Sequence, residues 1–327
     1  PDISGSGRFV TFMSNASNLV PGDTNGTNDI FVRDRQRNKT TRVSTRSNGN
    51  QPNSASTFPK ISADGRFVAF ESFASNLVPG DGNGTTDIFV KDRKTGKTRR
   101  VSLRSNGTQG SSASNHADIS PNGRYVSFTS SATNLVSGDT NGTTDVFLHD
   151  RKNKKTKRAS FGNAGEGNGQ SLLSTVSNKG QVAFVSQATN LVGGDTNATL
   201  DIFVRNTKAN NTRRVSISTA GVQANNQSPA AWRPQISGSG RYVLFESHAT
   251  NLVANDTNAA PDVFLRDRKQ NRTRRVSVRF DGSQANSTSF IADITNDGKF
   301  VAFLSNATNL VAGDTNATSD IFLRSTR

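Results

Sequence analysis

The chain has 327 residues, no cysteine, three histidines and a formal net charge of +15, from 40 Lys and Arg against 25 Asp and Glu. The lack of cysteine excludes a disulfide framework, a thiolate zinc site and a cysteine nucleophile. Its apolar runs fall well short of the ~18–20 residues that a membrane-spanning helix needs, so we expect no transmembrane segment.

One segment recurs six times, first as NLVPGDTNGTNDIFV at residues 18–32. A piece such as PKISADGRFVAFES (residues 59–72) precedes each copy, and one such as KTGKTRRVS (94–102) follows the first five. Self-similarity of this kind is typical of stacked supersecondary units that bury their apolar faces against one another. The last aspartate of the copies falls at Asp29, Asp87, Asp145, Asp201, Asp262 and Asp320.

Each copy predicts four short strands. In the second copy they fall around Ile61 and at residues 66–70, 87–92 and 98–102, with a turn at 94–97. The second and third strands are apolar on both faces, as in strands that are covered on both sides. In the fourth strand apolar residues alternate with arginine, which indicates a strand at the outer edge of the sheet. Helices are disfavoured because Val, Ile, Phe and Thr dominate the apolar positions and Gly, Asn and Asp interrupt them.

Six such sheets predict an all-β fold, a six-bladed β-propeller of four-stranded antiparallel blades that shield one another. A linear β-solenoid, with repeats of roughly 20–30 residues, is the competing arrangement. The sixth copy ends after DIFLRSTR, so the last blade lacks its outer strand. We expect further chain or a partner segment to complete it, because an open edge promotes aggregation. A single domain is predicted over 1–327, with blades at 1–58, 59–116, 117–173, 174–232, 233–290 and 291–327.

The pattern IS-x-DG-R-F/Y-V-A-F-x-S, then D-I/V-F-V/L, then T-R-R-V-S resembles the TolB-type, WD-like β-propeller repeats. The resemblance covers essentially the whole chain and recurs in all six copies. It implies a six-bladed propeller. Members of this superfamily are mostly extracytoplasmic binding or scaffold proteins, and some are the propeller halves of peptidases. The resemblance therefore implies a secreted, periplasmic or cell-surface location, and it does not specify a ligand.

A D-x-N-x-x-x-D loop joins the second and third strands of every copy. Oxygen ligands at positions 1, 3 and 7, with a backbone carbonyl at 5, suit Ca²⁺. Asp34 lies about 16 Å beyond Asp29 along an extended strand and cannot complete the site, so binding would be weak, at ~10⁻⁴–10⁻³ M. In the alternative interpretation these side chains make Asx-turns. The candidate metal ligands are Asp23, Asn25, Asp29, Asp81, Asn83, Asp87, Asp139, Asn141, Asp145, Asp195, Asn197, Asp201, Asp256, Asn258, Asp262, Asp314, Asn316 and Asp320.

Basic residues crowd the third and fourth strands of the first five copies and the turns between them. If the outer strands form a rim, these residues make a positive belt that attracts a polyanion. Alternatively, they protect edge strands from pairing with other sheets. Specific nucleic-acid binding is disfavoured because exposed aromatic residues for base stacking are lacking. The residues are Arg33, Arg35, Arg37, Lys39, Arg42, Lys91, Arg93, Lys94, Lys97, Arg99, Arg100, Arg151, Lys152, Lys154, Lys155, Lys157, Arg158, Arg205, Lys208, Arg213, Arg214, Arg266, Arg268, Lys269, Arg272, Arg274 and Arg275.

The sequence contains no G-x-S-x-G, H-E-x-x-H or phosphate-binding motif. We interpret the three histidines as ordinary substitutions within the repeat and not as catalytic residues; they are His116, His149 and His248. We therefore predict a non-catalytic extracellular or cell-surface binding or scaffold protein. Its predicted partners are an anionic polysaccharide or another protein, and its predicted cofactor is structural calcium in the loops. The rival prediction is an enzyme: a lactonase-like or hydrolase-like propeller with a central metal, or the propeller part of a larger peptidase.

Overall fold

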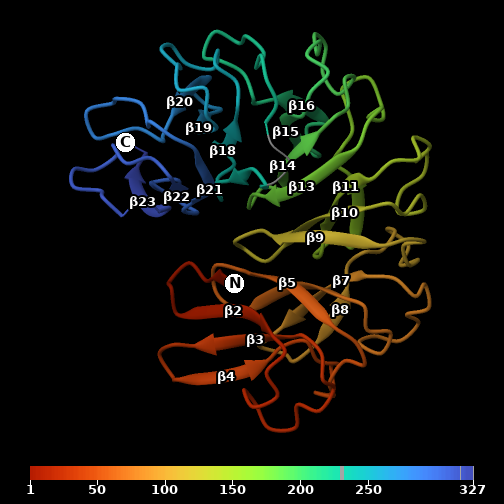
Figure 1. Cartoon of the computed structure of the whole chain (residues 1–327). Coiled ribbons are helices and arrows are strands. Elements are labelled where there is room, and N and C mark those ends of the chain that lie inside the picture. The colour runs from red at the N-terminus through yellow and green to blue at the C-terminus, as the bar shows by residue number, and fades with distance from the viewer. Residues whose placement is uncertain (229–231, 317, 327) are drawn as a thin grey trace. The chain divides into compact units, whose positions relative to one another are not determined.

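The computed structural model describes residues 1–228, 232–316 and 318–326, and over these residues the chain consists of strands and turns (Figure 1). The strands form six antiparallel sheets, of which five have four strands and one has three. In every sheet the strands lie side by side in chain order. The predicted all-β architecture of six repeated sheets is confirmed. Among the described residues there is no helix with the length and hydropathy needed to cross a bilayer.

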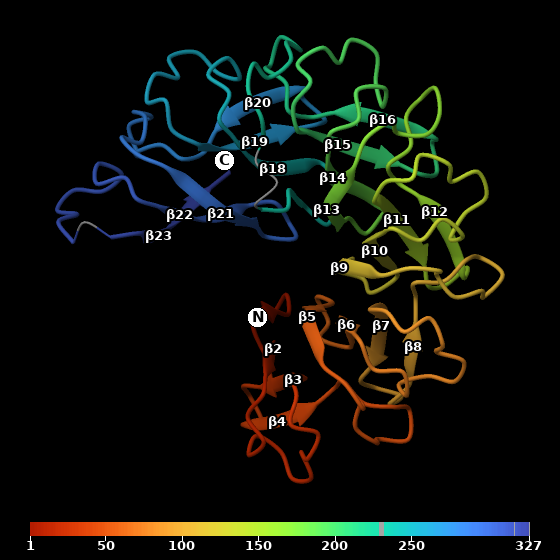
Figure 2. The ribbon, with the colours of Figure 1, turned by 45° about the vertical axis from the view of Figure 1, so that its right-hand side comes forward.

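The chain divides into two compact units. The first unit, Pro1–Ala159, contains three four-stranded sheets that follow one another along the chain (Figure 2). The strands of the first sheet are β1 (Asp2–Ile3), β2 (Phe9–Ser14), β3 (Asp29–Asp34) and β4 (Lys39–Arg42); those of the second are β5 (Ser56–Ile61), β6 (Phe67–Ser72), β7 (Asp87–Asp92) and β8 (Thr98–Arg100); those of the third are β9 (Ser114–Ile119), β10 (Tyr125–Ser130), β11 (Asp145–Asp150) and β12 (Lys155–Arg158).

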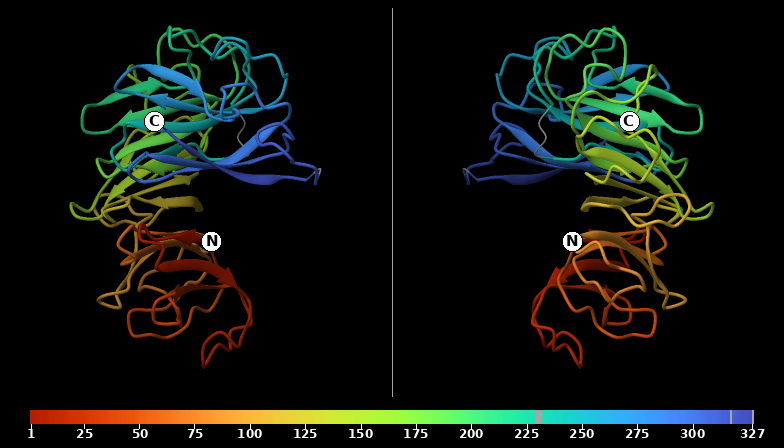
Figure 3. Two further views of the ribbon diagram at one scale, coloured as in Figure 1. Left: turned by 90° about the vertical axis from the view of Figure 1, so that its left-hand side faces the viewer. Right: turned by 90° about the vertical axis from the view of Figure 1, so that its right-hand side faces the viewer.

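The second unit, Ser160–Arg327, contains two four-stranded sheets and then the three-stranded one, which is blue in Figure 3. The strands of the fourth sheet are β13 (Ser171–Val176), β14 (Gln181–Ser186), β15 (Asp201–Asn206) and β16 (Asn211–Arg214); those of the fifth are β17 (Gln235–Ile236), β18 (Tyr242–Ser247), β19 (Asp262–Asp267) and β20 (Arg272–Arg275); those of the sixth are β21 (Ser289–Ile294), β22 (Phe300–Ser305) and β23 (Asp320–Ser325).

The two central strands of each sheet pair over six residues in one common register. In the second sheet Phe67 lies opposite Asp92 and Ser72 opposite Asp87, so that Phe70 meets Phe89. Both of these phenylalanines are fully buried, as the two-sided apolar pattern predicts. Their rings stack with centroids 5.9 Å apart. The same stack recurs in the other five sheets, at Phe12–Phe31, Phe128–Phe147, Phe184–Phe203, Phe245–Phe264 and Phe303–Phe322.

The first strand of four sheets begins earlier than the sequence pattern suggests. In the second sheet β5 begins at Ser56, and its register shifts between Thr57 and Lys60. Phe58, inside this irregular stretch, has a φ of 47°, the left-handed conformation. A bulge of this kind breaks the alternation of apolar residues that identifies a strand, so only the end of the strand near Ile61 stands out in the sequence. The same left-handed residue recurs at His116, Leu173 and Ile291.

Within each unit, one face of a sheet packs against the next sheet. Between the first two sheets, Ile30 and Val32 of β3 share an apolar core with Val68 and Phe70 of β6. All four side chains are fully buried. Comparable cores join the second and third sheets, the fourth and fifth, and the fifth and sixth. The middle sheet of each unit is therefore covered on both sides, which explains why its central strands are apolar on both faces.

A glycine in the turn before the second strand allows one of these close approaches. Gly65 has a φ of +70°, and a Cβ atom placed on it would come within 2.1 Å of the Phe9 ring of the preceding sheet. The guanidinium of Arg93 lies over the same ring, 4.4 Å from its centroid. A side chain at position 65 would therefore meet both backbone strain and a steric clash.

Candidate functional site at the acidic loops and outer strands

In the second sheet the two loop aspartates share an arginine from the outer strand. Nη1 of Arg100 lies 3.0 Å from Oδ1 of Asp81 and 3.2 Å from Oδ2 of Asp87. The pairing of Arg100 with Phe89 across β7 and β8 sets this position, because it places the arginine beside the loop that leads into β7. All three side chains are buried, with at most 7% of each exposed. The positive charge between the two carboxylates is thus the guanidinium of Arg100.

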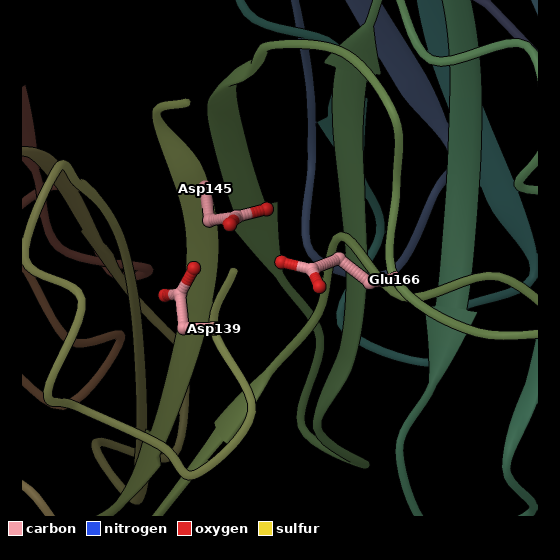
Figure 4. Close-up of side chains that lie close together, drawn as sticks. All are labelled: Asp139, Asp145 and Glu166. Atoms are coloured by element: carbon pink, nitrogen blue, oxygen red, sulfur yellow. The ribbon is translucent and has the colours of Figure 1, made fainter. Parts of the chain in front are cut away.

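The same arrangement recurs in the other four complete sheets, with distances of 3.0 to 3.2 Å from Nη1 to both carboxylates. In the third sheet Asp139 and Asp145 lie side by side, one from the loop and one from the start of β11 (Figure 4). Glu166, also labelled there, belongs to the second unit. The arginines are Arg42, Arg158, Arg214 and Arg275.

A serine two residues after the arginine completes the contact. The hydroxyl of Ser102 donates to Oδ1 of Asp87 at 2.5 Å and accepts the backbone N–H of Ile88 at 3.1 Å. Ser44, Ser216 and Ser277 make the same two bonds in their own sheets. Together with a threonine two residues before the arginine, these residues define the outer-strand motif Thr-x-Arg-Val/Ala-Ser, which occurs at 40–44, 98–102, 156–160, 212–216 and 273–277.

The loop asparagines make Asx-turns. Oδ1 of Asn83 accepts the backbone N–H of Thr85 at 3.2 Å, and its Nδ2 donates to Oδ2 of Asp87 at 3.3 Å and to the carbonyl of Gly110 at 3.0 Å. The turn bond occurs in all six loops. The loop asparagines thus make the Asx-turns that the alternative interpretation of the sequence predicts.

Burial and pairing act in opposite directions on these carboxyls. Desolvation raises the pKa of Asp87, and the hydrogen bond from Ser102 and the charge of Arg100 oppose that increase. The pKa values of Asp29, Asp201 and Asp262 are raised by the same cause. Burial thus disfavours the ionised form of these carboxyls, and the serine hydroxyl and the arginine stabilise it.

The residues of the five complete loops fit a guanidinium better than a calcium ion. A Ca²⁺ ion that used both aspartates would have to displace a buried arginine that already contacts them, and would leave that arginine without its partners. In the sixth loop, with Asp314, Asn316 and Asp320, no arginine of the described residues forms an ion pair with either aspartate. Calcium binding to the loops stays a prediction.

The predicted basic belt needs correction at about half of its positions. Arg42, Arg100, Arg158, Arg214 and Arg275 point inward to the acidic loops, and others such as Lys91, Arg205 and Arg266 are buried. Nζ of Lys91, for example, donates to Oγ1 of Thr45 at 2.7 Å. The predicted belt residues that remain exposed are Arg35, Arg37, Lys39, Lys94, Lys97, Arg99, Lys152, Lys154, Lys155, Lys157, Lys208, Arg213, Lys269 and Arg272.

Sequence reasoning missed a second repeated ion pair. Arg66 makes two hydrogen bonds to Asp92, from Nε at 2.9 Å and from Nη2 at 2.8 Å, and this contact lowers the pKa of Asp92 to about 2. The sequence contains a signal for this ion pair, because the arginine and the aspartate are absent from the same copies. In the sixth copy Lys299 and Ser325 replace them. In the fourth copy Asn206 replaces the aspartate, and no residue holds the place of the arginine, because Gln181 directly follows Gly180 and lies opposite Asn206. Equivalent pairs are Arg8–Asp34, Arg124–Asp150 and Arg241–Asp267.

The loop contacts also include glutamines that the motif did not reveal. Nε2 of Gln109 donates to Oδ1 of Asp81 at 3.0 Å and to Oδ2 of Asp87 at 3.2 Å. The bridges Leu103–Gln109 and Phe161–Glu166 place Glu166 at the corresponding position of its own repeat. The recurrence of glutamine at positions 51, 109, 223 and 284 is the signal that could have found it.

The buried histidine and the glutamates have structural contacts. His149 occupies the position of Lys91, hydrogen-bonds Oγ1 of Thr156 at 2.9 Å through Nδ1, and has a pKa lowered to about 4 by burial. Oε1 of Glu246 accepts the backbone N–H of Ile291 at 2.6 Å. Burial raises the pKa of Glu246 to about 7. Glu71 accepts the N–H of His116 in the same way, so each acid supports the bulge of the next sheet.

The comparisons with known proteins identify the fold. No protein-family model and no curated protein matches this sequence. TolB from Acinetobacter baumannii is 14% identical, with a TM-score of 0.50 over 94% of this chain and 62% of that one. The β-propeller domain of the Trilobed protease from Pyrococcus furiosus is 10% identical, with a TM-score of 0.56 over 99% of this chain and 81% of that one.

Pyrococcus horikoshii acylaminoacyl peptidase is 12% identical, with a TM-score of 0.55 over 97% of this chain but only 43% of that one. This chain thus spans less than two thirds of the length of TolB or of the peptidase. The six sheets are the blades of a β-propeller fold. The predicted TolB-type, six-bladed propeller with a three-stranded last blade is confirmed at the level of fold.

Proposed function

We propose that this chain is a non-catalytic binding module that acts outside the cytoplasm and holds an anionic polysaccharide on the outer strands of its second and third blades. The observation that carries the proposal is a cluster of exposed basic side chains on two segments that contain no acidic residue, 93–104 and 151–158. We call it the basic surface, and it consists of Lys97, Arg99, Arg104, Lys152, Lys154, Lys155 and Lys157.

Hydrogen bonds between the two blades hold the two halves of the basic surface together. The loop after β8 lies along the outer edge of β12, where the hydroxyl of Thr156 donates to the carbonyl of Leu103 and its backbone N–H donates to Oγ of Ser105 at 3.0 Å. Arg104 lies between these two loop residues, and Lys155 and Lys157 flank Thr156. The charges of β8, of its following loop and of β12 therefore form one surface.

The segments that carry the basic surface have no acidic residue of their own. Segments 93–104 and 151–158 contain no aspartate or glutamate, whereas the inward arginines of the same strands are neutralised by the acidic loops. A row of exposed like charges attracts a polymer of opposite charge through many weak contacts, which salt screens. Lysine, as a flexible point charge, suits anionic groups of varied geometry. The location outside the cytoplasm is supported by the resemblance to the TolB-type repeats.

Chromatography on immobilised heparin, used as a sulfated polysaccharide, tests the proposal. We expect the chain to bind at low salt and to elute as the salt concentration rises. The triple variant K154Q/K155Q/K157Q should elute at clearly lower salt. The matched control K208Q/K269Q/R272Q removes the same charge from exposed positions of the second unit and should elute close to the parent. Passage of the parent straight through the column, or equal shifts for both triple variants, would contradict the proposal.

The second candidate function is the propeller part of a peptidase. It is supported by the similarity to the Trilobed protease domain and to acylaminoacyl peptidase. An assay of the purified chain with fluorogenic peptide substrates tests whether the chain itself is catalytic. The binding-module proposal expects no turnover above the buffer control, and turnover that persists after repeated purification would overturn its non-catalytic part.

A further inference from the structure

Two arginines of the second unit lie near each other where the fourth sheet meets the fifth, and among the described residues neither forms an ion pair. They are Arg213 of β16, which is exposed, and Arg268, which directly follows β19 and is half-buried. We propose that these two arginines, together with the side-chain amides of Gln181 and Asn206, bind a phosphate or sulfate group. This site is separate from the basic surface of the first unit and does not depend on the function proposed above.

The strand register places three of these side chains on one face of the fourth sheet. Gln181 lies opposite Asn206 across β14 and β15. Arg213 lies opposite Val204, two residues before Asn206. Because directly opposed residues and every second residue of a strand project from the same face, the three side chains share the face of Val204. Val204 packs with Val243 of β18, so this face covers the fifth sheet (Figure 1).

The fifth sheet brings Arg268 to the same place. Nη1 of Arg268 donates to the carbonyl of Gly240, in the turn before β18. The side chain of Gln181 lies against the same glycine, because a Cβ atom placed on Gly240 would come within 1.8 Å of Oε1 of Gln181. Arg268 and Gln181 therefore meet at one turn, although they belong to different sheets.

The fourth copy lacks the carboxylate that accompanies this arginine in the second and third sheets. There Asp92 holds the place of Asn206, and Arg151 is the counterpart of Arg268. Burial lowers the pKa of Arg151, and the charge of Asp92 opposes that decrease. Burial also lowers the pKa of Arg268, to about 10, and the charge of Arg213 adds to the decrease. Since both partners of the Arg–Asp ion pair are missing from the fourth copy, no carboxylate oxygen remains there to repel an anion.

The two amides supply further hydrogen-bond donors. Oδ1 of Asn206 accepts the backbone N–H groups of Lys208 and Ala209, each at 3.1 Å. Its Nδ2 therefore takes the place of Oδ2 of Asp92, which accepts Nη2 of Arg66 at 2.8 Å in the second sheet. No residue replaces Arg66 in the fourth copy, so this Nδ2 faces the space that the arginine fills elsewhere.

The chemistry of these groups matches an oxyanion. Guanidinium groups bind phosphate and sulfate through paired, charge-assisted hydrogen bonds, and amide NH₂ groups add neutral donors. Arg213 is exposed, and its guanidinium makes no hydrogen bond within the described residues, so it can turn towards an anion held by Arg268. The donors come from two sheets, which explains why no single segment of the sequence reveals the site.

Isothermal titration calorimetry with inorganic sulfate, inorganic phosphate and methyl phosphate tests the proposal, with sodium chloride keeping the ionic strength constant. We expect saturable binding by the parent. R213Q should weaken binding by about tenfold or more, because charge-assisted hydrogen bonds are lost. N206D, which introduces the carboxylate of the other copies, should weaken it at least as much. The matched control R99Q removes the exposed arginine at the same position of the second sheet and should leave binding unchanged.

Three results would overturn the proposal: no saturable heat with any of the anions, equal losses for R213Q and R99Q, or binding by N206D as tight as by the parent. Binding of methyl phosphate assigns the site to a phosphate group on a larger molecule, and binding of the inorganic ions alone assigns it to a free ion. Both variants of the site change residues at its surface, and circular dichroism checks that each is folded. Failure here leaves the polysaccharide proposal intact, because heparin binding is tested with lysines of the first unit.

Discussion

Replacement of Arg100 by leucine should destabilise the first unit strongly. The variant R100L removes the one cation that two buried carboxylates share, at 3.0 and 3.2 Å. Loss of one partner from a buried ion pair costs about 3–5 kcal/mol, because the remaining charge stays buried and uncompensated. For a cooperative unit of this size, about 1 kcal/mol corresponds to 2–4 °C in the melting temperature. We therefore expect the melting temperature to fall by about 6–20 °C.

Thermal and urea unfolding, followed by far-UV circular dichroism, measures this loss. The matched control is R99L, one residue away on the same strand but exposed to solvent, and its unfolding midpoint should stay at that of the parent. The triple variant D81N/R100L/D87N, which removes all three charges together, should recover much of the stability lost in R100L. If R100L and R99L unfold at the same midpoint, the shared arginine does not stabilise the blade and the reasoning is wrong.

Three further predictions concern calcium at the loop of Arg100, the glycine turn at Gly65 and the ion pair of Arg66 with Asp92. Calcium at 10 mM should raise the melting temperature of R100L more than that of the parent, by the equivalent of about 1.4 kcal/mol for a site of ~10⁻³ M; equal shifts in both would show that the ion does not use the place that Arg100 leaves. Gly65→Ala should cost at least about 1 kcal/mol in urea unfolding, from left-handed strain and a clash with a neighbouring ring. Gly82→Ala, at an open position without a positive φ, should have no such cost. The pKa of Asp92 is lowered from 3.8 to about 2, so its stabilising effect is present above pH 3.8 and is lost as the pH falls towards 2. Acid titration of R66Q should therefore unfold the chain at a higher pH than the parent, and an unchanged acid midpoint would exclude this pair as a source of acid stability.

Local patterns in the sequence were sufficient for the fold. Six copies of one segment, strands that are apolar on both faces and turns rich in Gly, Asn and Asp predict six antiparallel sheets because each property depends on neighbours in the chain. The absence of an outer strand after DIFLRSTR was equally visible. The early start of β5 was not, because the bulge at Phe58 interrupts the alternation on which strand prediction depends.

The partners of the charged residues were decided by tertiary structure. A D-x-N-x-x-x-D loop considered alone offers oxygen atoms to any cation, and an arginine-rich strand considered alone looks like a solvent-exposed rim. The register between β7 and β8 brings Arg100 to Asp81 and Asp87, which lie 19 and 13 residues earlier in the chain. Because that pairing turns one arginine of each outer strand inward and leaves its neighbour Arg99 in solvent, only the folded sheet separates the charges that stabilise the blade from those that remain for a partner.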